Sequence, residues 1–239
     1  MLFIIIIFFI FLLYYFLRNP TELLQPYNIL IENIHEKKVF YNEEEKKEIF
    51  PTSQTLENNW KEIRRECIDC LQNIPNINEL DNVGKNYIVE DDSFWQGWKT
   101  FDFRMFSKDN EDNMKKCPVL AHILKNDPNI TSAFFSIMES GKTLSSHYGP
   151  FKGILRYHLG LICPPEESGP CFISVDGETY DWNDGEGVLF DETYKHFVHN
   201  KTPYNRVILF LDVKRPMKTY TLTLINDLIL YMMGISPYN

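Results

Sequence analysis

The stretch Ser145–Val213 reads SSHYGPFKGILRYHLGLICPPEESGPCFISVDGETYDWNDGEGVLFDETYKHFVHNKTPYNRVILFLDV, and it decides the fold. Short runs rich in β-branched and aromatic residues alternate in it with the turn-forming residues Gly, Pro, Asn and Asp. Six short strands without intervening helical patterns are typical of a sandwich or barrel, so we predict a mainly β fold with flanking helices. The predicted strands are Ser132–Met138, Gly153–Ile162, Cys171–Val175, Gly187–Phe190, His196–Asn200 and Asn205–Val213.

Charged side chains stand inside these predicted strands, where packed strands normally carry apolar residues. Because side chains alternate between the two faces of a strand, Arg156 and His158 share one face of Gly153–Ile162, opposite a row of apolar residues. Arg206 likewise shares its face with apolar residues of the last strand. An inward-facing arginine without a partner is costly, so these positions predict a bound anion. The two-pronged geometry of arginine suits a dicarboxylic acid.

Two histidines predict a metal site. His147 and His196 come from separate parts of the sheet, and two neutral imidazoles are good ligands for Fe(II) or a similar ion. The common non-haem iron site adds a carboxylate two residues after the first histidine, where this chain has Gly149. Asp191 or Asp212 could donate instead, and spacing alone leaves this open. Of two other histidines, His199 is predicted to lie at the surface, and His122 to be at the surface or hydrogen-bonded within the fold.

Composition excludes one class of partner. The 239 residues carry a formal net charge of −9, and the sequence pI is about 5.2. Proteins that bind the phosphate backbone usually present a basic face, so we expect no nucleic-acid partner.

The N-terminus predicts a membrane anchor. Leu2 to Leu17 are unbroken apolar and aromatic residues, which as a helix would reach about 24 Å of a ~30 Å hydrocarbon core. A basic segment before the run and a small-residue cleavage site after it are both missing, which favours an anchor at residues 1–18 over a signal peptide. Residues 19–49 are predicted to be a polar stalk, with the charge run at 43–48 solvated, and residues 50–239 to be the domain.

Helices are predicted on both sides of the strands, at Thr55–Ile74, Cys117–Lys125 and Tyr220–Met233. The last of these is apolar enough to dock on the domain or touch a membrane surface. The aromatic-rich segment Gly84–Phe106 is predicted to pair as strands.

The five cysteines do not settle the redox compartment. Cys67 and Cys70 form a CxxC on the apolar face of a helix, and without a second CxxC they are predicted to be core residues. Cys163 and Cys171 flank the loop at residues 164–170, where they would form a disulfide in an oxidising lumen or remain free thiols in a reducing compartment.

Several blocks of the chain resemble one known family as a set. They are FSIMESG, SSHYGP, LRYHLGL, the W-x-x-G-E-G-V-L-F-D run from Trp182 to Asp191, the YKH at Tyr194 to His196, and NRVILFLDVKRP. Over roughly Trp60 to Pro216 the chain resembles the aspartyl/asparaginyl β-hydroxylases. The resemblance implies a double-stranded β-helix of the jelly-roll or cupin type, with its core at about residues 132–216. It also accommodates Gly149, because family members use two histidines and have glycine where the carboxylate would be.

The resemblance also implies cofactors and roles. His147 and His196 would bind Fe(II), with water in the place of the missing carboxylate, and Arg206 would clamp the distal carboxylate of the co-substrate 2-oxoglutarate. Ser136, Arg156 and His158 would hold its other polar atoms. O2 would be the second co-substrate, and ascorbate would support turnover. Phe197 and the loop at residues 164–170 depart from the family pattern, which leaves the substrate open.

The first functional hypothesis is therefore a membrane-anchored dioxygenase that hydroxylates Asp or Asn side chains of a protein or peptide, with an endoplasmic reticulum location and a lumenal catalytic domain. The same chemistry on a lipid acyl chain is an alternative that the anchor would suit. A catalytically silent jelly-roll binding module at the membrane is another. Because His147, His196 and Arg206 are all present, the sequence favours the enzyme.

Overall fold

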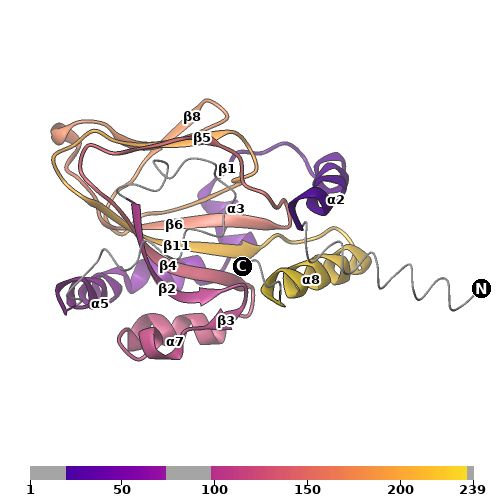
Figure 1. Cartoon of the computed structure of the whole chain (residues 1–239), viewed down its shortest axis with the longest axis horizontal. Helices are drawn as coiled ribbons and strands as arrows, with labels where there is room; N and C mark the ends of the chain where they lie inside the picture. The colour runs from indigo at the N-terminus through magenta and orange to yellow at the C-terminus, as the bar shows by residue number, and fades with distance from the viewer. Residues whose placement is uncertain (1–19, 74–97, 236–239) are drawn as a thin grey trace, which may run out of the picture.

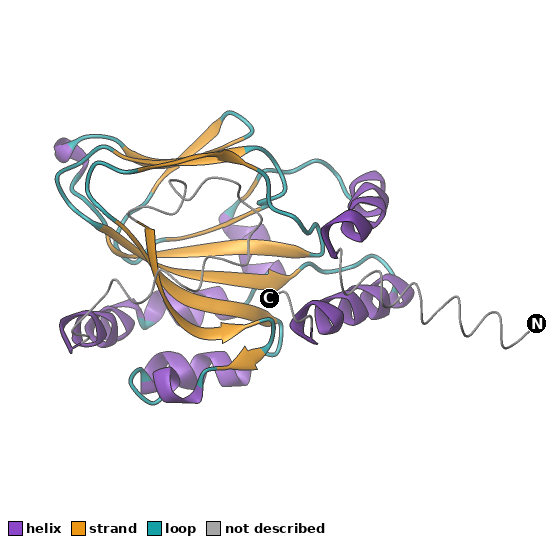
Figure 2. Cartoon of the chain, in the orientation of Figure 1, coloured by secondary structure: helices purple, strands orange, loops and turns teal. Residues whose placement is uncertain are grey.

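Two antiparallel β-sheets face each other and helices cover the outside of the larger one (Figures 1 and 2). The computed structural model describes residues 20–73 and 98–235. The larger sheet has the strand order β1-β9-β6-β11-β4-β2-β3 and the smaller one β5-β10-β7-β8. The strands are β1 (Phe40–Tyr41), β2 (Trp98–Met105), β3 (Lys108–Asp109), β4 (Ile130–Met138), β5 (Thr143–His147), β6 (Ile154–Ile162), β7 (Cys171–Val175), β8 (Glu178–Asp181), β9 (Gly187–Phe190), β10 (His196–Asn200) and β11 (Arg206–Lys214).

The eight strands from β4 to β11 have the order of a jelly roll. Strands β4, β6, β9 and β11 lie in the larger sheet, and β5, β7, β8 and β10 form the smaller one. Such an exchange between two facing sheets is the arrangement of a jelly roll with two Greek keys. All six predicted strands are confirmed, with bounds within a few residues. The other two strands of this set, β5 and β8, are short and mostly polar, and the sequence pattern does not predict them.

Alternation along the strands separates two apolar layers. Leu155, Tyr157 and Leu159 of β6 point outward into a core shared with the helices. Ile173 and Val198 of the smaller sheet instead meet Ile208 of the larger one in a second core between the sheets. Arg156 and His158, on the other side of β6, therefore face the interior of the jelly roll, as the sequence pattern predicts.

Four helices pack on the outer face of the larger sheet: α4 (Thr52–Asn58), α5 (Trp60–Asn73), α6 (Glu111–Met114) and α7 (Pro118–Asn126). The single helix predicted at Thr55–Ile74 is divided at Asn59, which caps α4. Cys67 and Cys70 are buried in this core, so their predicted role as core residues is confirmed. The Sγ atom of Cys70 lies 3.4 Å from that of Cys117, and all five cysteines are free in the structure, Cys163 and Cys171 included.

The prediction that residues 19–49 form a polar stalk was wrong. They contain helix α2 (Pro20–Ile34), strand β1 and helix α3 (Glu43–Ile49). Leu24, Tyr27 and Ile31 lie on one side of α2 and pack against α8 (Tyr220–Ile235), which confirms the predicted C-terminal helix. These three residues have the spacing of one helical face, so they form an apolar side that packs on the domain. The polar residues between them lie on the other sides of the helix.

The charge run at residues 43–48 is likewise part of the domain. Asn42 and Glu45 form a reciprocal capping box at the start of α3, and the side chain of Lys46 is buried. Its Nζ donates to Glu57 Oε1 and to the carbonyl of Gly187, both at 2.7 Å. Residues 20–49 therefore pack as part of the domain, which the sequence predicts to start near residue 50.

Two predictions fall outside the described residues: the anchor at residues 1–18, and the part of Gly84–Phe106 that precedes Trp98. Within residues 20–73 and 98–235, no helix is both long enough and apolar enough to cross a membrane.

Candidate functional site

His147 and His196 lie side by side in the smaller sheet. β5 and β10 pair antiparallel with His196 opposite His147, and the two ring centroids are 4.1 Å apart. The Nδ1 of His147 is 2.8 Å from the carbonyl oxygen of Ser145, and that of His196 is 2.9 Å from the carbonyl oxygen of Tyr194. A histidine that donates Nδ1–H to a carbonyl carries its lone pair on Nε2, which is the arrangement typical of a metal ligand.

Burial keeps both imidazoles neutral. It lowers the pKa of His196 to about 3, helped by the adjacent His147, and it also lowers the pKa of His147. Because only the neutral imidazole binds a metal ion, the pair is ready to bind one at neutral pH without first losing protons.

The space beside Gly149 is filled by a neighbouring side chain. A Cβ atom built on Gly149 would lie 2.3 Å from Cδ of Glu192, so no larger residue fits there without displacing Glu192. Neither aspartate considered from the sequence is free to donate, because Asp212 pairs with Arg156 and Asp191 accepts hydrogen bonds from other groups. Within the described ranges, no group of three or more His, Cys, Asp or Glu side chains could hold a metal ion. The histidine pair is therefore the set of side chains that could bind a metal ion here.

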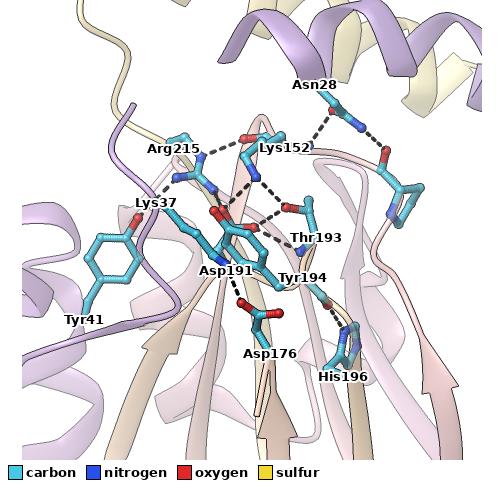
Figure 3. A network of polar contacts seen from close by, with 11 residues as sticks. Asn28, Lys37, Tyr41, Lys152, Asp176, Asp191, Thr193, Tyr194, His196 and Arg215 are labelled. Atoms are coloured by element: carbon cyan, nitrogen blue, oxygen red, sulfur yellow. Dashed lines mark hydrogen bonds and ion pairs between the residues drawn. The ribbon is translucent and has the colours of Figure 1, made fainter. Parts of the chain in front are cut away.

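A polar network around Asp191 lies beside His196 (Figure 3). The Asp191 carboxylate accepts hydrogen bonds from Arg215 Nη2 and from the hydroxyl and backbone N–H of Thr193. Lys152 Nζ donates to the Thr193 hydroxyl at 3.0 Å and lies 3.6 Å from Asp191. The network therefore fastens the turn that leads into His196 to the segment that follows His147.

Arg206 is a buried cation without a carboxylate partner among the described residues. Its guanidinium lies 4.5 Å from the ring centroid of Trp182, and Nη2 donates to Ser136 Oγ at 3.4 Å. Its Nε has no hydrogen-bond partner in the part of the chain that the structure describes. Burial lowers the pKa of Arg206 to about 10, which still leaves it charged at neutral pH. Because an unpaired buried charge is costly, this geometry calls for an anion.

Arg156 differs from Arg206 in being paired. Its Nε and Nη2 each donate to Asp212 Oδ1 at 3.0 Å, and Nη1 forms an ion pair with Glu192. Burial raises the pKa of the Glu192 carboxyl, and the charge of Arg156 opposes that shift. Both sides of this guanidinium are thus occupied by carboxylates, and the predicted contact of Arg156 with a co-substrate stays a prediction.

His158 and Ser136 lie next to Arg206 on neighbouring strands. His158 is buried between the rings of Phe190 and Phe210, at 4.9 and 5.0 Å, and neither of its ring nitrogens has a hydrogen-bond partner among the described residues. Burial holds the pKa of His158 well below its usual value, with Arg206 as the largest neighbouring charge. Ser136 accepts a 2.8 Å hydrogen bond from Trp98 Nε1.

The N–H donors among the orphaned polar groups, one of them on the neutral His158 ring, fit a bound anion with several oxygen atoms. Nε of Arg206, both nitrogens of His158 and Nε1 of Trp182 are buried without partners in the described chain. Buried polar groups are normally hydrogen-bonded, so such a cluster marks a place for a ligand. The remaining histidines lie apart from it. His122 is exposed, which confirms the surface alternative, whereas His199 is half-buried and contacts Thr143.

The sequence of this chain also matches a known protein family. The family model described as "Aspartyl/Asparaginyl beta-hydroxylase" matches residues 57–216. The chain belongs to the aspartyl/asparaginyl β-hydroxylase family. The matched residues contain both histidines, both arginines, Ser136 and His158.

Named relatives of this hydroxylase-family chain fall into two kinds. It is 35% identical over 173 residues to "Ornithine lipid ester-linked acyl 2-hydroxylase" of Rhizobium tropici, which covers 71% of this chain and 59% of the relative. It is 30% identical over 173 residues to "Aspartyl/asparaginyl beta-hydroxylase" of Homo sapiens, which covers 70% of this chain and 21% of the relative. The chain therefore spans only part of either relative.

Among solved structures, cupin domains overlap with the chain at a low level. A cupin domain of an XRE family transcriptional regulator from Enterobacter cloacae has a TM-score of 0.35 at 15% identity, covering 51% of this chain and 100% of that one. The Cnp3 cupin domain of Schizosaccharomyces pombe also has a TM-score of 0.35, at 12% identity, covering 55% and 69%. These TM-scores are too low to support a fold assignment. The jelly-roll assignment rests on the strand order.

Two residues of this hydroxylase-family site were not predicted from the sequence. Trp182 lies beneath Arg206, and Glu192 fills the space beside Gly149. Trp182 opens one of the blocks that resemble the family, so its residue type was visible in the sequence although its contact with Arg206 was not. For Glu192 the sequence carried no signal, because its neighbours are set by how the loops close over the smaller sheet.

Proposed function

We propose that this protein is an Fe(II)- and 2-oxoglutarate-dependent dioxygenase that hydroxylates an unactivated C–H bond. The observation that carries the proposal is Arg206, a buried cation without a carboxylate partner among the described residues, in the same interior as the paired His147 and His196. One ligand with a distal carboxylate and a metal-chelating end would satisfy both features. The membership in a hydroxylase family supports the reaction class.

The residues of this chain would bind the metal ion and the co-substrate. His147 and His196 would hold the metal ion through Nε2, and Arg206 would take the distal carboxylate of 2-oxoglutarate in a two-pronged contact. Bound together, Fe(II), 2-oxoglutarate and O2 would supply the oxidising chemistry that no side chain provides. The Trp182 ring lies against Arg206 and would keep water from this contact, which strengthens it.

Aspartyl or asparaginyl side chains of a protein are the first candidate substrate. The description of the matching family and the name of the human relative both support it. The carboxylate or amide of such a side chain would need polar partners in the site, and the charge of Arg156 is felt there, since it lowers the pKa of both His147 and His196.

A lipid acyl chain is the second candidate. The relative from Rhizobium tropici is named as an acyl 2-hydroxylase of a lipid, and exposed apolar side chains gather on α2 and α8 of this chain. With either substrate, we propose that residues 1–18 anchor the protein in a membrane as a single span.

The test is the conversion of 2-oxoglutarate to succinate by the full chain, supplied with Fe(II), O2 and ascorbate. Asp- and Asn-containing peptides and bilayer-forming lipids would be offered in separate arms, and products would be weighed by mass spectrometry. We expect succinate formation together with one arm whose product gains an oxygen atom. The His147→Ala, His196→Ala double variant should lose turnover, whereas the exposed His122→Ala should keep it. Turnover that persists in the double variant would refute the assignment of the site.

A further inference from the structure

Large apolar side chains are exposed together at one end of the molecule. Ten such side chains are exposed among the described residues, and eight of them lie on α2 and α8. Five from α8 have exposed fractions of 47–77% and recur every three or four residues, so they form one stripe along the helix. The stripe consists of Tyr220, Leu224, Leu228, Tyr231 and Ile235.

The opposite side of α8 is packed on the domain. Ile229 and Leu230 are buried there, and Asn226 donates to the carbonyl of Gly153 at 2.9 Å. A helix that is apolar on both sides is normally covered on both sides, by protein or by lipid. The stripe is therefore an exposed apolar surface that is expected to contact another protein surface or lipid.

Helix α2 extends this surface. Tyr27 donates its hydroxyl hydrogen to Asn226 Oδ1 at 2.9 Å and so ties the two helices together, and both lie at the same end of the molecule (Figure 1). Ile29 and Leu30, exposed by 57% and 44%, point away from the buried side of α2. The stripe together with Ile29 and Leu30 is called the α2–α8 face below.

The sequence next to this face indicates what covers it. The apolar run Leu2–Leu17 ends three positions before Pro20, where α2 begins, so a span there would keep this end of the domain close to the bilayer. The one charged residue within α8, Asp227, is neutralised by Lys214 at 2.7 Å. Tyrosines at positions 220 and 231 carry the amphipathic ring that favours the depth of lipid headgroups.

We propose that the α2–α8 face rests on the surface of a lipid bilayer. The domain is then docked on the membrane as well as tethered to it, with the stripe at the boundary between headgroups and acyl chains. Exposed Lys218 lies just before α8 and suits contact with anionic headgroups.

Docking in this way also orients the site. Asn28 of α2 donates to the carbonyl of Pro150 at 2.9 Å and accepts from the backbone N–H of Lys152 at 2.8 Å (Figure 3). The docked helix is thus bonded directly to the segment that follows His147. The proposal does not depend on the oxygenase chemistry, and it holds for a protein or a lipid substrate.

The test places nitroxide labels on the full chain in vesicles of phosphatidylcholine and phosphatidylserine. Single cysteines would be introduced as Leu228→Cys and Tyr231→Cys in a Cys163→Ala background, since the other four native cysteines are buried. Lys115→Cys, whose side chain is 72% exposed immediately after α6, is the control. Collisions with dissolved O2, which concentrates in lipid, and with a water-soluble nickel chelate would be measured at each label.

The proposal predicts that labels at 228 and 231 gain collisions with O2 and lose collisions with nickel, while the control stays accessible to nickel. Free access of nickel to both labels would overturn it. Loss of collisions with both reagents would also overturn it, because the cover would then be protein. Dipolar broadening between labels would identify that protein as a second copy, and its absence would identify the N-terminal segment. Since no turnover is measured, failure here and failure of the oxygenase proposal are separate results.

Discussion

Arg156 and Arg206 are both buried in the interior of the jelly roll, yet only Arg156 has carboxylate partners among the described residues. Asp212 and Glu192 together compensate the charge of Arg156. Arg206 instead has a serine hydroxyl and the face of Trp182. The difference is the one expected between an arginine that holds a fold together and one that waits for a ligand.

Replacing each arginine by methionine should separate the two roles. Arg206→Met should weaken 2-oxoglutarate binding by about 30-fold or more, the effect of losing one partner of a buried charge pair, without lowering the free energy of unfolding. Arg156→Met should lower the free energy of unfolding by about 3–5 kcal/mol, because it leaves two buried carboxylates uncompensated. Calorimetric titration and urea unfolding measure these quantities. Equal losses of stability in both variants would contradict the assignment.

His158 gives a pH dependence with a definite sign. Its pKa in the folded protein lies well below the ordinary value of 6.5 because of burial, so below pH 6.5 the unfolded chain binds a proton that the folded chain does not. His158 therefore lowers the free energy of unfolding as the pH falls from 6.5 towards its pKa in the folded protein. His158→Phe removes that cost, and relative to the wild type it should gain about 1.4 kcal/mol in the free energy of unfolding per pH unit below 6.5.

Urea unfolding of the wild type and His158→Phe at pH 7.5, 6 and 5 measures this effect. Taking the difference between the two proteins cancels contributions from Glu192 and the other histidines, which both proteins share. A difference that stays constant over this range would contradict the prediction, because it would show that His158 binds its proton equally in the folded and unfolded states.

At the scale of elements, α3 shows why a charge run is a weak guide to exposure. Lys46 is buried with its Nζ against Glu57 and the Gly187 carbonyl, while the adjacent Lys47 is exposed. The two lysines look alike in the sequence. What distinguishes them is a carbonyl 141 positions away, which no local pattern contains.

This pair makes a matched test of whether residues 20–49 belong to the domain. Lys46→Met should lower the free energy of unfolding by about 3 kcal/mol, because Glu57 would lose its buried cationic partner. Lys47→Met should change it by less than about 0.5 kcal/mol, as surface substitutions usually do. Chemical denaturation of both variants provides the comparison, and an equally small effect of Lys46→Met would restore the stalk interpretation.

The strands were predictable where the chain alternates strongly. In β6, outward-facing Leu155, Tyr157 and Leu159 alternate with inward-facing Arg156 and His158, and the structure keeps this pattern. β5 and β8 escaped prediction because their residues are mostly polar and exposed, and they become strands through pairing with β10 and β7. Helix α2 carried a usable signal in the spacing of its buried residues, which its polar residues obscured.

At the scale of the whole molecule, the site is assembled from both sheets. The histidine pair comes from the smaller sheet, and Ser136, His158 and Arg206 come from three adjacent strands of the larger one. The chemical types of these residues were predictable from the sequence and from its resemblance to the family. Their contacts were not, since the position of Trp182 under Arg206 and of Glu192 beside Gly149 depends on how the two sheets and their loops close on each other.

The oxygenase assignment is tested most directly by the binding of 2-oxoglutarate to the full chain under anaerobic conditions, with and without Fe(II), measured by titration calorimetry. Binding should require Fe(II) in the wild type and in His122→Ala, and it should be lost in the His147→Ala, His196→Ala double variant. Binding of equal strength without Fe(II) or in the double variant, or no binding to the wild type, would contradict the assignment.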